Sequence, residues 1–139
     1  MSQIPDSPYG SWSSPLSAQE ITETVNTPTD ITIHQNQLFW LELRAKENSR
    51  LTLMTVRDGV QMELTPAPFN LRSRLHEYGG GAYLVKDAQA FFCNAEDQSI
   101  YCLDSLAGEA SPVPITEKST CRYADMQVDL CRGRLICIR

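Results

Sequence analysis

Residues 31–64 read ITIHQNQLFWLELRAKENSRLTLMTVRDGVQMEL, and this stretch decides the fold class. Its β-branched, aromatic and alternating apolar residues form runs that each have the length of one strand, at 31–33, 38–43, 51–56 and 60–64. Turn signals separate the runs, with Gln35-Asn36 after the first and Asp58-Gly59 after the third. No stretch sustains a helical repeat of apolar residues. The pattern predicts antiparallel strands joined by hairpins.

The same order of strands recurs farther along the chain, with runs at 82–85, 90–94, 99–103 and 113–115. Leu38-Phe39-Trp40 aligns with Ala90-Phe91-Phe92, and Leu64-Thr65 aligns with Ile115-Thr116. The offsets of these two alignments differ by one residue. Such agreement indicates an internal repeat.

Four strands repeated about every 40–50 residues are typical of β-propeller blades. A third set begins at Tyr123 and is still in its second strand when the sequence ends. We predict an all-β fold, a partial β-propeller of about two and a half four-stranded antiparallel blades, with blades at about 31–66, 82–116 and 123–139. A closed propeller pairs its last blade with its first, so this chain alone is expected to leave strand edges bare. A small sandwich or barrel with similar strands is the alternative.

Residues 1–30 are rich in Pro, Ser and Thr and predict an amino-terminal arm ahead of the propeller, residues 31–139. Ser17-Ala18-Gln19-Glu20 is a capping-box pattern, which predicts one short helical turn. Tyr9 and Trp12 are the expected anchors of the arm on a neighbouring surface.

Composition excludes several classes of partner. The net charge is −5 and Lys and Arg do not cluster, which argues against nucleic acid. No apolar run approaches the roughly 20 residues that a bilayer requires, and residues 1–10 lack the features of a secretory signal. We expect a cytoplasmic protein with no membrane partner.

The five cysteines include no C-x-x-C pair; they are Cys93, Cys102, Cys121, Cys131 and Cys137. In a reducing compartment they are expected to be small buried apolar side chains. Neither a metal site nor a disulfide framework is predicted.

The segment 70–81, NLRSRLHEYGGG, joins the first repeat to the second. His76-Glu77 lacks the second His of a zinc protease, because position 80 is Gly. The glycines lead into a strand rather than a helix, so no dinucleotide fingerprint is formed, and the Lys of a phosphate loop is missing. We predict no metal and no cofactor. The glycines are expected to allow positive φ and a close backbone approach.

The charged residues of this segment are the candidate site. In the functional interpretation, Arg72, Arg74, His76 or Glu77 point into the propeller funnel and contact a peptide, for example by an Arg fork on a carboxylate. In the structural interpretation, these charges pair with one another and fix the blade junction. Arg122 and Asp125 before the third repeat are expected to form a structural pair. His34 is expected to be exposed and without a role.

No catalytic residue is predicted. The G-x-S-x-G nucleophile elbow does not occur in the sequence, and only two histidines are available as bases. A Cys–His pair stays open as a distant alternative. The chain alone is therefore not expected to be an enzyme.

Five pieces of the sequence together resemble one family: Tyr9–Trp12 with Ser14–Ala18, Thr65–Asn70, Arg74–Gly81, Asp97-Gln98 and Arg122–Asp125. They are similar to the amino-terminal propeller of the acylaminoacyl-peptidase and dipeptidyl-aminopeptidase branch of the prolyl oligopeptidase family. The resemblance implies a propeller of about seven or eight blades that caps an α/β-hydrolase domain with a Ser-Asp-His triad and restricts entry to small peptides.

We expect this sequence to depart from that family by lacking the later blades and the hydrolase domain, so no triad residue is carried over. The prediction is a non-catalytic, truncated propeller fragment of a serine peptidase, whose partners are a second chain supplying the missing parts and the peptide substrate of the full enzyme. The alternative is an independent β interaction module that self-associates through its open blade edges.

Overall fold

The computed structural model describes residues 10, 14–23, 25–78, 80–107 and 110–139. Its strands form three antiparallel sheets, with the orders β1-β2-β3-β4, β5-β6-β7-β8 and β9-β10. The elements are α1 (Ala18–Glu23), β1 (Thr27–His34), β2 (Gln37–Arg44), η1 (Ala45–Glu47), β3 (Arg50–Arg57), β4 (Val60–Glu63), η2 (Leu75–Glu77), β5 (Tyr83–Lys86), β6 (Gln89–Cys93), β7 (Ile100–Leu103), β8 (Val113–Pro114), β9 (Ala124–Asp129) and β10 (Arg134–Ile138).

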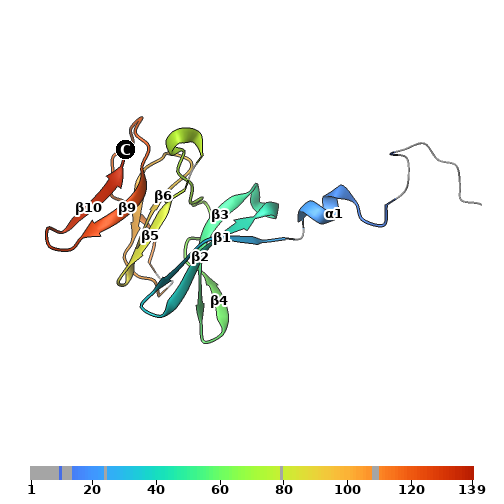
Figure 1. Cartoon of the computed structure of the whole chain (residues 1–139), viewed down its shortest axis with the longest axis horizontal. Coiled ribbons are helices and arrows are strands. Elements are labelled where there is room, and N and C mark those ends of the chain that lie inside the picture. The colour runs from blue at the N-terminus through green and yellow to red at the C-terminus, as the bar shows by residue number, and fades with distance from the viewer. Residues whose placement is uncertain (1–9, 11–13, 24, 79, 108–109) are drawn as a thin grey trace, which may run out of the picture.

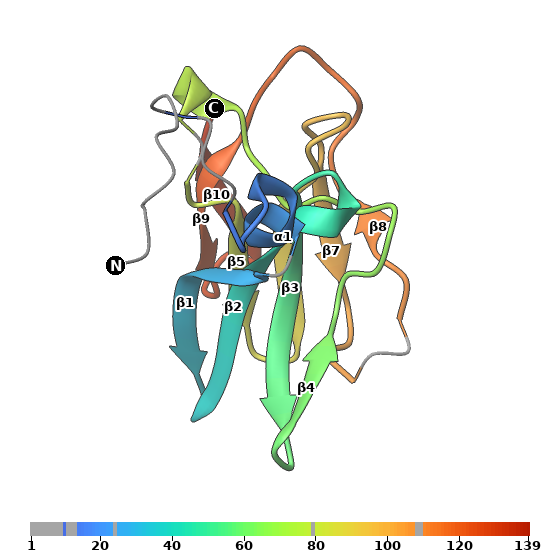
Figure 2. The same cartoon turned by 90° about the vertical axis from the view of Figure 1, so that its right-hand side faces the viewer.

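The three sheets lie side by side in chain order (Figure 1). Figure 2, turned by 90°, shows the first sheet in front of the others and α1 ahead of it. Each four-stranded sheet follows the order of the sequence, as blades of a propeller do. The predicted all-β partial propeller is confirmed.

The middle sheet packs on both neighbours, because successive side chains of a strand point to opposite faces. Ala90 and Phe92 of β6 belong to the core between the first and second sheets, together with Phe39 of β2. Cys93 of the same strand belongs to a second core with Met126 of β9. The alternating side chains of β6 therefore pack the middle sheet against both of its neighbours. Within the described residues, β10 pairs with β9 and not with β1.

Strand β1 begins at Thr27, four residues before the predicted start at Ile31. Thr27 pairs with Leu43, and the register shifts between Thr29 and Thr32. Asp30 lies within this irregularity with a φ of 48°. Pro28 is tolerated here because β1 is an edge strand, whose N–H groups need no partner on one side.

The capping box predicted ahead of α1 is confirmed. The Glu20 N–H donates to Ser17 Oγ at 3.1 Å, and the Ser17 N–H donates to Glu20 Oε2 at 2.9 Å. Tyr9 and Trp12, the expected anchors of the arm, lie outside the described residues. Among the described residues, no helix has the length and apolar character needed to cross a bilayer.

The cysteines are less uniformly buried than predicted. Cys93 and Cys102 are buried, as expected, whereas Cys121 and Cys137 are half-buried. Cys131 is exposed, so the prediction is wrong there. Its position in the turn between β9 and β10 explains the difference, because a hairpin turn projects away from the sheets.

Candidate functional site

The segment from Asn70 to Arg72 is bonded to both four-stranded sheets. The Leu71 N–H donates to the Leu51 carbonyl of β3 at 2.9 Å. The Arg72 N–H donates to the Cys93 carbonyl of β6 at 3.1 Å, and the Asn70 carbonyl accepts from the Ala95 N–H at 2.7 Å. The main chain at the base of the candidate site is thus held between two blades.

Gln98 fixes the next stretch through its side-chain amide. Its Nε2 donates to the Arg72 carbonyl at 3.2 Å, and its Oε1 accepts from the Arg74 N–H at 2.7 Å. Gln98 was part of the family resemblance, but nothing else in the sequence indicated this contact. These two hydrogen bonds fix the backbone at Arg72 and Arg74.

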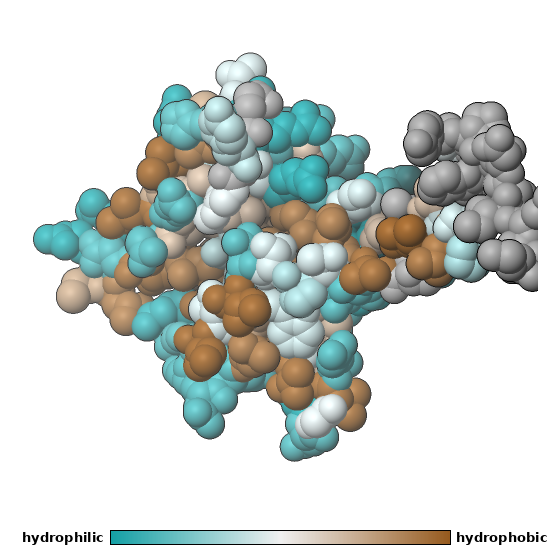
Figure 3. All heavy atoms as spheres, turned by 45° about the vertical axis from the view of Figure 1, so that its right-hand side comes forward, coloured by the Kyte–Doolittle hydropathy of each residue, from teal (hydrophilic) through white to brown (hydrophobic). Residues whose placement is uncertain are grey.

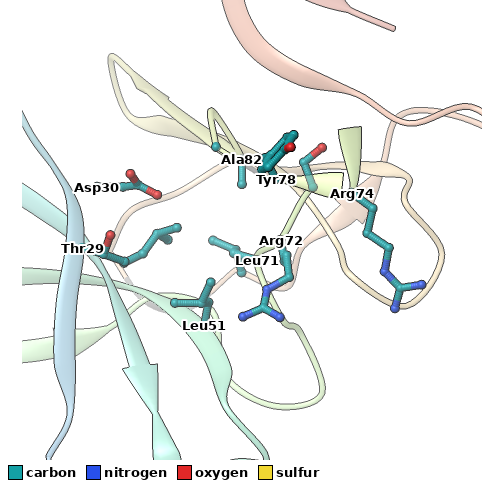
Figure 4. Close-up of a pocket in the computed structure, with 11 residues that line it drawn as sticks. Thr29, Asp30, Leu51, Leu71, Arg72, Arg74, Tyr78 and Ala82 are labelled. Atoms are coloured by element: carbon teal, nitrogen blue, oxygen red, sulfur yellow. The ribbon is translucent and has the colours of Figure 1, made fainter. Parts of the chain in front are cut away.

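A cavity of about 410 Å³ lies between β1 and this segment (Figure 4). Its apolar lining comes mainly from Leu41, Leu51 and Leu71. Its charged lining residues are Asp30 from β1 and Arg72 and Arg74 from the segment. In Figure 4, Asp30 lies on one side of the cavity and the arginines on the other.

The cavity borders β1, the first strand of the first sheet. The Tyr83 hydroxyl of β5 donates to the Asp30 carbonyl of β1, and β5 in turn lies against β9. A second hollow shares Asp30 and Ala82 and continues between β1 and β5. In a propeller the first strand of each blade lies nearest the central channel. In such a ring, the β1 side of the cavity would face the channel.

The structure brings two of the four predicted site residues to this cavity, Arg72 and Arg74. His76 lies in η2 with a φ of 53° and is exposed, and it does not line the cavity. Glu77 also lies in η2, and its side chain is outside the described part of the structure. Asp30 was missed, because its place opposite Arg72 depends on contacts between segments about forty residues apart.

The structural interpretation, in which these charges pair with one another, finds no support for the two arginines within the described residues. Neither the Arg72 nor the Arg74 guanidinium makes an ion pair or hydrogen bond there. Both side chains are exposed. Their donors are available to a ligand.

The entrance to the third sheet supports the glycine segment. Arg122 Nη1 donates to the Arg74 carbonyl at 3.0 Å, and the Asp125 N–H donates to the Gly81 carbonyl at 3.0 Å.

His34 also has a structural contact, which corrects the expectation that it is exposed and without a role. It is half-buried, and its Nε2 accepts from the Asp87 N–H at 2.9 Å across the first two sheets.

Gly81 is expected to be intolerant of a side chain. Its φ is +54°, and an added Cβ would lie 2.0 Å from Asp125 Oδ1 and 2.7 Å from Asp125 N. The Gly81→Ala substitution should therefore lower the free energy of unfolding by about 3 kcal/mol, combining left-handed strain with overpacking. Gly80→Ala is the matched control, because its φ is +94° but nothing lies within 4 Å. Urea denaturation measures both, and equal losses would contradict the steric argument.

The buried cysteines are poor nucleophiles in this structure. Burial, with a smaller contribution from Cys137, raises the pKa of Cys93 to about 12, and its Sγ donates to the Tyr123 carbonyl at 3.0 Å. Burial, with Asp104 beside it, raises the pKa of Cys102 to about 11. Within the described residues, no hydrogen bond joins a cysteine to a histidine. Neither buried cysteine therefore supports the Cys–His alternative.

No protein-family model matches the sequence, and no curated protein matches it. Solved structures do match. A Mycobacterium tuberculosis puromycin-hydrolyzing peptidase is similar with a TM-score of 0.80 and 34% identity, over 94% of this chain and 21% of that chain. A puromycin hydrolase gives a TM-score of 0.79 and 29% identity, over 95% of this chain and 22% of that one. A mutant puromycin hydrolase complexed with PGG gives a TM-score of 0.79 and 29% identity, over 93% of this chain and 21% of that one. The chain spans about a fifth of the length of these structures.

Proposed function

We propose that this chain, an amino-terminal β-propeller portion of the prolyl oligopeptidase family, forms the opening blades of a peptidase propeller and controls the entry of short peptides. The observation that carries this proposal is the match of nearly the whole chain to solved peptidases, at an identity that reaches 34%. The family resemblance read from the sequence is confirmed by the same match. The cavity beside β1 supplies a surface on which an entering peptide can be held.

In this proposal, bond cleavage belongs to residues outside these 139. A serine hydrolase needs a nucleophile, a base and an orienting group held together. The sequence contains no G-x-S-x-G elbow to present such a nucleophile. The chain then contributes binding and exclusion rather than chemistry.

Reconstitution tests the proposal. The chain is mixed with a polypeptide from the same genome that carries a G-x-S-x-G elbow and matches the remaining length of the solved peptidases. We expect no hydrolysis of aminoacyl-4-nitroanilides by the chain alone, and activity that rises with added chain to a one-to-one ratio. Turnover by the purified chain would refute the non-catalytic role. Failure of the mixture to form a complex would refute the role as opening blades.

A self-associating interaction module is the second candidate, and one surface favours it. On the outer face of the first sheet, Ile31 is 64% exposed and Ile33 is 73% exposed. A groove of about 520 Å³ lies beside them, lined by Leu38 and Trp40 among others. Figure 3, in which this side of the molecule comes forward, shows several apolar groups exposed.

The internal repeat indicates what this face is built to contact. Leu38 and Trp40 align with Ala90 and Phe92, which pack on the preceding sheet. The outer face of the first sheet therefore corresponds to a face that receives a blade. In the peptidase role that blade comes from the rest of the ring, and in the module role it comes from a second copy. Light scattering of the purified chain separates the two, because symmetric oligomers without a partner favour the module.

A further inference from the structure

We propose that the cavity between β1 and residues 71–74, 78, 80 and 82 binds the carboxyl-terminal carboxylate of a short peptide on Arg72. This inference rests on the proposed function, because it assumes that peptides enter along the first strands. It goes further by naming the chemical group that is recognised and the residue that recognises it. The argument depends on how Arg72 is held, on the lining beside it and on the charge opposite.

Arg72 combines a fixed backbone with a free side chain. Its N–H donates to the Cys93 carbonyl at 3.1 Å, and its carbonyl accepts from Gln98 Nε2 at 3.2 Å. Leu71, the preceding residue, is fully buried. The guanidinium has no partner among the described residues. A guanidinium carries five N–H donors in a planar fork that fits a carboxylate with two parallel hydrogen bonds.

The lining beside Arg72 is apolar. Leu51 and Leu71 line the same cavity as Arg72 (Figure 4). Leu41 and Leu71 are at most 1% exposed, so Leu51, which is half-buried, offers most of the leucine surface that a ligand can reach. An uncharged aliphatic side chain next to a carboxylate suits this combination, because its apolar surface leaves water while the carboxylate stays on the cation. A peptide that ends in leucine has that form.

Asp30 defines which peptides are excluded. It lines the cavity opposite the arginines, and its carboxylate makes no hydrogen bond or ion pair among the described residues. Its backbone is fixed, because the carbonyl accepts from the Tyr83 hydroxyl and the φ is 48° within the irregular part of β1. A second carboxylate on the ligand would meet this charge and be repelled. Peptides that end in an acidic residue should therefore bind less tightly.

The experiment compares two peptides that differ in one charge, N-acetyl-Ala-Ala-Leu and its carboxyl-terminal amide, by ¹⁵N-HSQC titration of the full chain. We expect the acid to bind about tenfold more tightly than the amide, as a charge-assisted pair on an exposed Arg allows. The Arg72→Gln variant should remove this preference. Arg134→Gln is the matched control, because Arg134 is exposed on β10 and does not line the cavity, and it should keep the preference.

A third peptide tests the opposite charge. N-acetyl-Ala-Ala-Glu should bind several-fold more weakly than the leucine peptide, and Asp30→Asn should reduce that difference by relieving repulsion. Equal affinity of the wild-type chain for the acid and the amide would overturn the inference, and this result requires no variant to fold. Retention of the full preference in Arg72→Gln would overturn it too. An active reconstituted peptidase whose chain shows no preference would leave the proposed function standing and reject this site.

Discussion

Replacing Arg50 by methionine is expected to lower the free energy of unfolding by about 3–5 kcal/mol, the cost of leaving the partners of a buried charge unpaired. The Arg50 residue is 8% exposed. Its Nη2 donates to Glu63 at 2.6 Å and its Nε donates to Glu47 at 2.7 Å. Its Nη1 donates to the carbonyls of Thr65 and Phe69, each at 3.1 Å. Methionine fills similar space but supplies none of these donors.

The loss should depend on pH in a defined direction. Burial raises the pKa of Glu63, but the hydrogen bonds from Arg50 and Thr52 outweigh it, so the pKa lies below its ordinary value of 4.5. A carboxylate with a depressed pKa contributes stability that is present above its unfolded pKa and is lost as the pH falls through the folded value. The difference in unfolding free energy between wild type and Arg50→Met should therefore have its largest value at pH 7 and should become smaller below about pH 4.5.

Urea denaturation at pH 7 and pH 3.5 measures both expectations. Arg134→Met is the matched control, because Arg134 is exposed on β10 and a substitution there should change stability by less than about 0.5 kcal/mol. If Arg50→Met loses no more unfolding free energy than Arg134→Met, the hydrogen bonds of Arg50 do not stabilise the first blade.

The strands and their stacking could be predicted from the sequence because they depend on local patterns. Turn residues and alternating apolar residues determine hairpins within a few positions, so β2, β3 and β6 lie where they were expected. The alignment of Leu38-Phe39-Trp40 with Ala90-Phe91-Phe92 also predicts which side of each sheet these residues face. Phe39 and Phe91 both face the next blade.

The charged residues show why the rest could not be predicted. Arg50 begins a strand and has the pattern of a surface residue, but its burial depends on carbonyls of residues 65 and 69 that a later loop brings to it. Asp30 faces the cavity because β1 shifts its register near that residue, a feature set by pairing with β2. Arg72 and Arg74 were recognised because their segment is unusual in itself. The carboxylate opposite them was not, because it belongs to another blade.

Phe92→Ala is expected to have the second large effect, a loss of about 3–5 kcal/mol in the free energy of unfolding. Phe92 is 0% exposed and lies in the core shared by the first two blades. Its ring packs edge-to-face with Phe69 at a centroid distance of 5.7 Å and stacks on Tyr101 at 5.7 Å with an interplanar angle of 14°. Removing the ring leaves a cavity between two sheets that cannot close without moving a blade.

Phe91→Ala is the matched control for Phe92, because Phe91 is the neighbouring residue on β6, half-buried against the third sheet. In a stack of blades each sheet is stabilised by its neighbours. Weakening one interface should therefore let the blades on its two sides unfold in separate transitions. We expect a single transition for the wild type and Phe91→Ala, and two separate transitions for Phe92→Ala, followed by circular dichroism during denaturation. Phe92→Ala could instead unfold in one transition, with a loss of unfolding free energy equal to that of Phe91→Ala. In that case the Phe92 interface does not stabilise the first two blades, and it cannot be what fixes the candidate cavity beside β1.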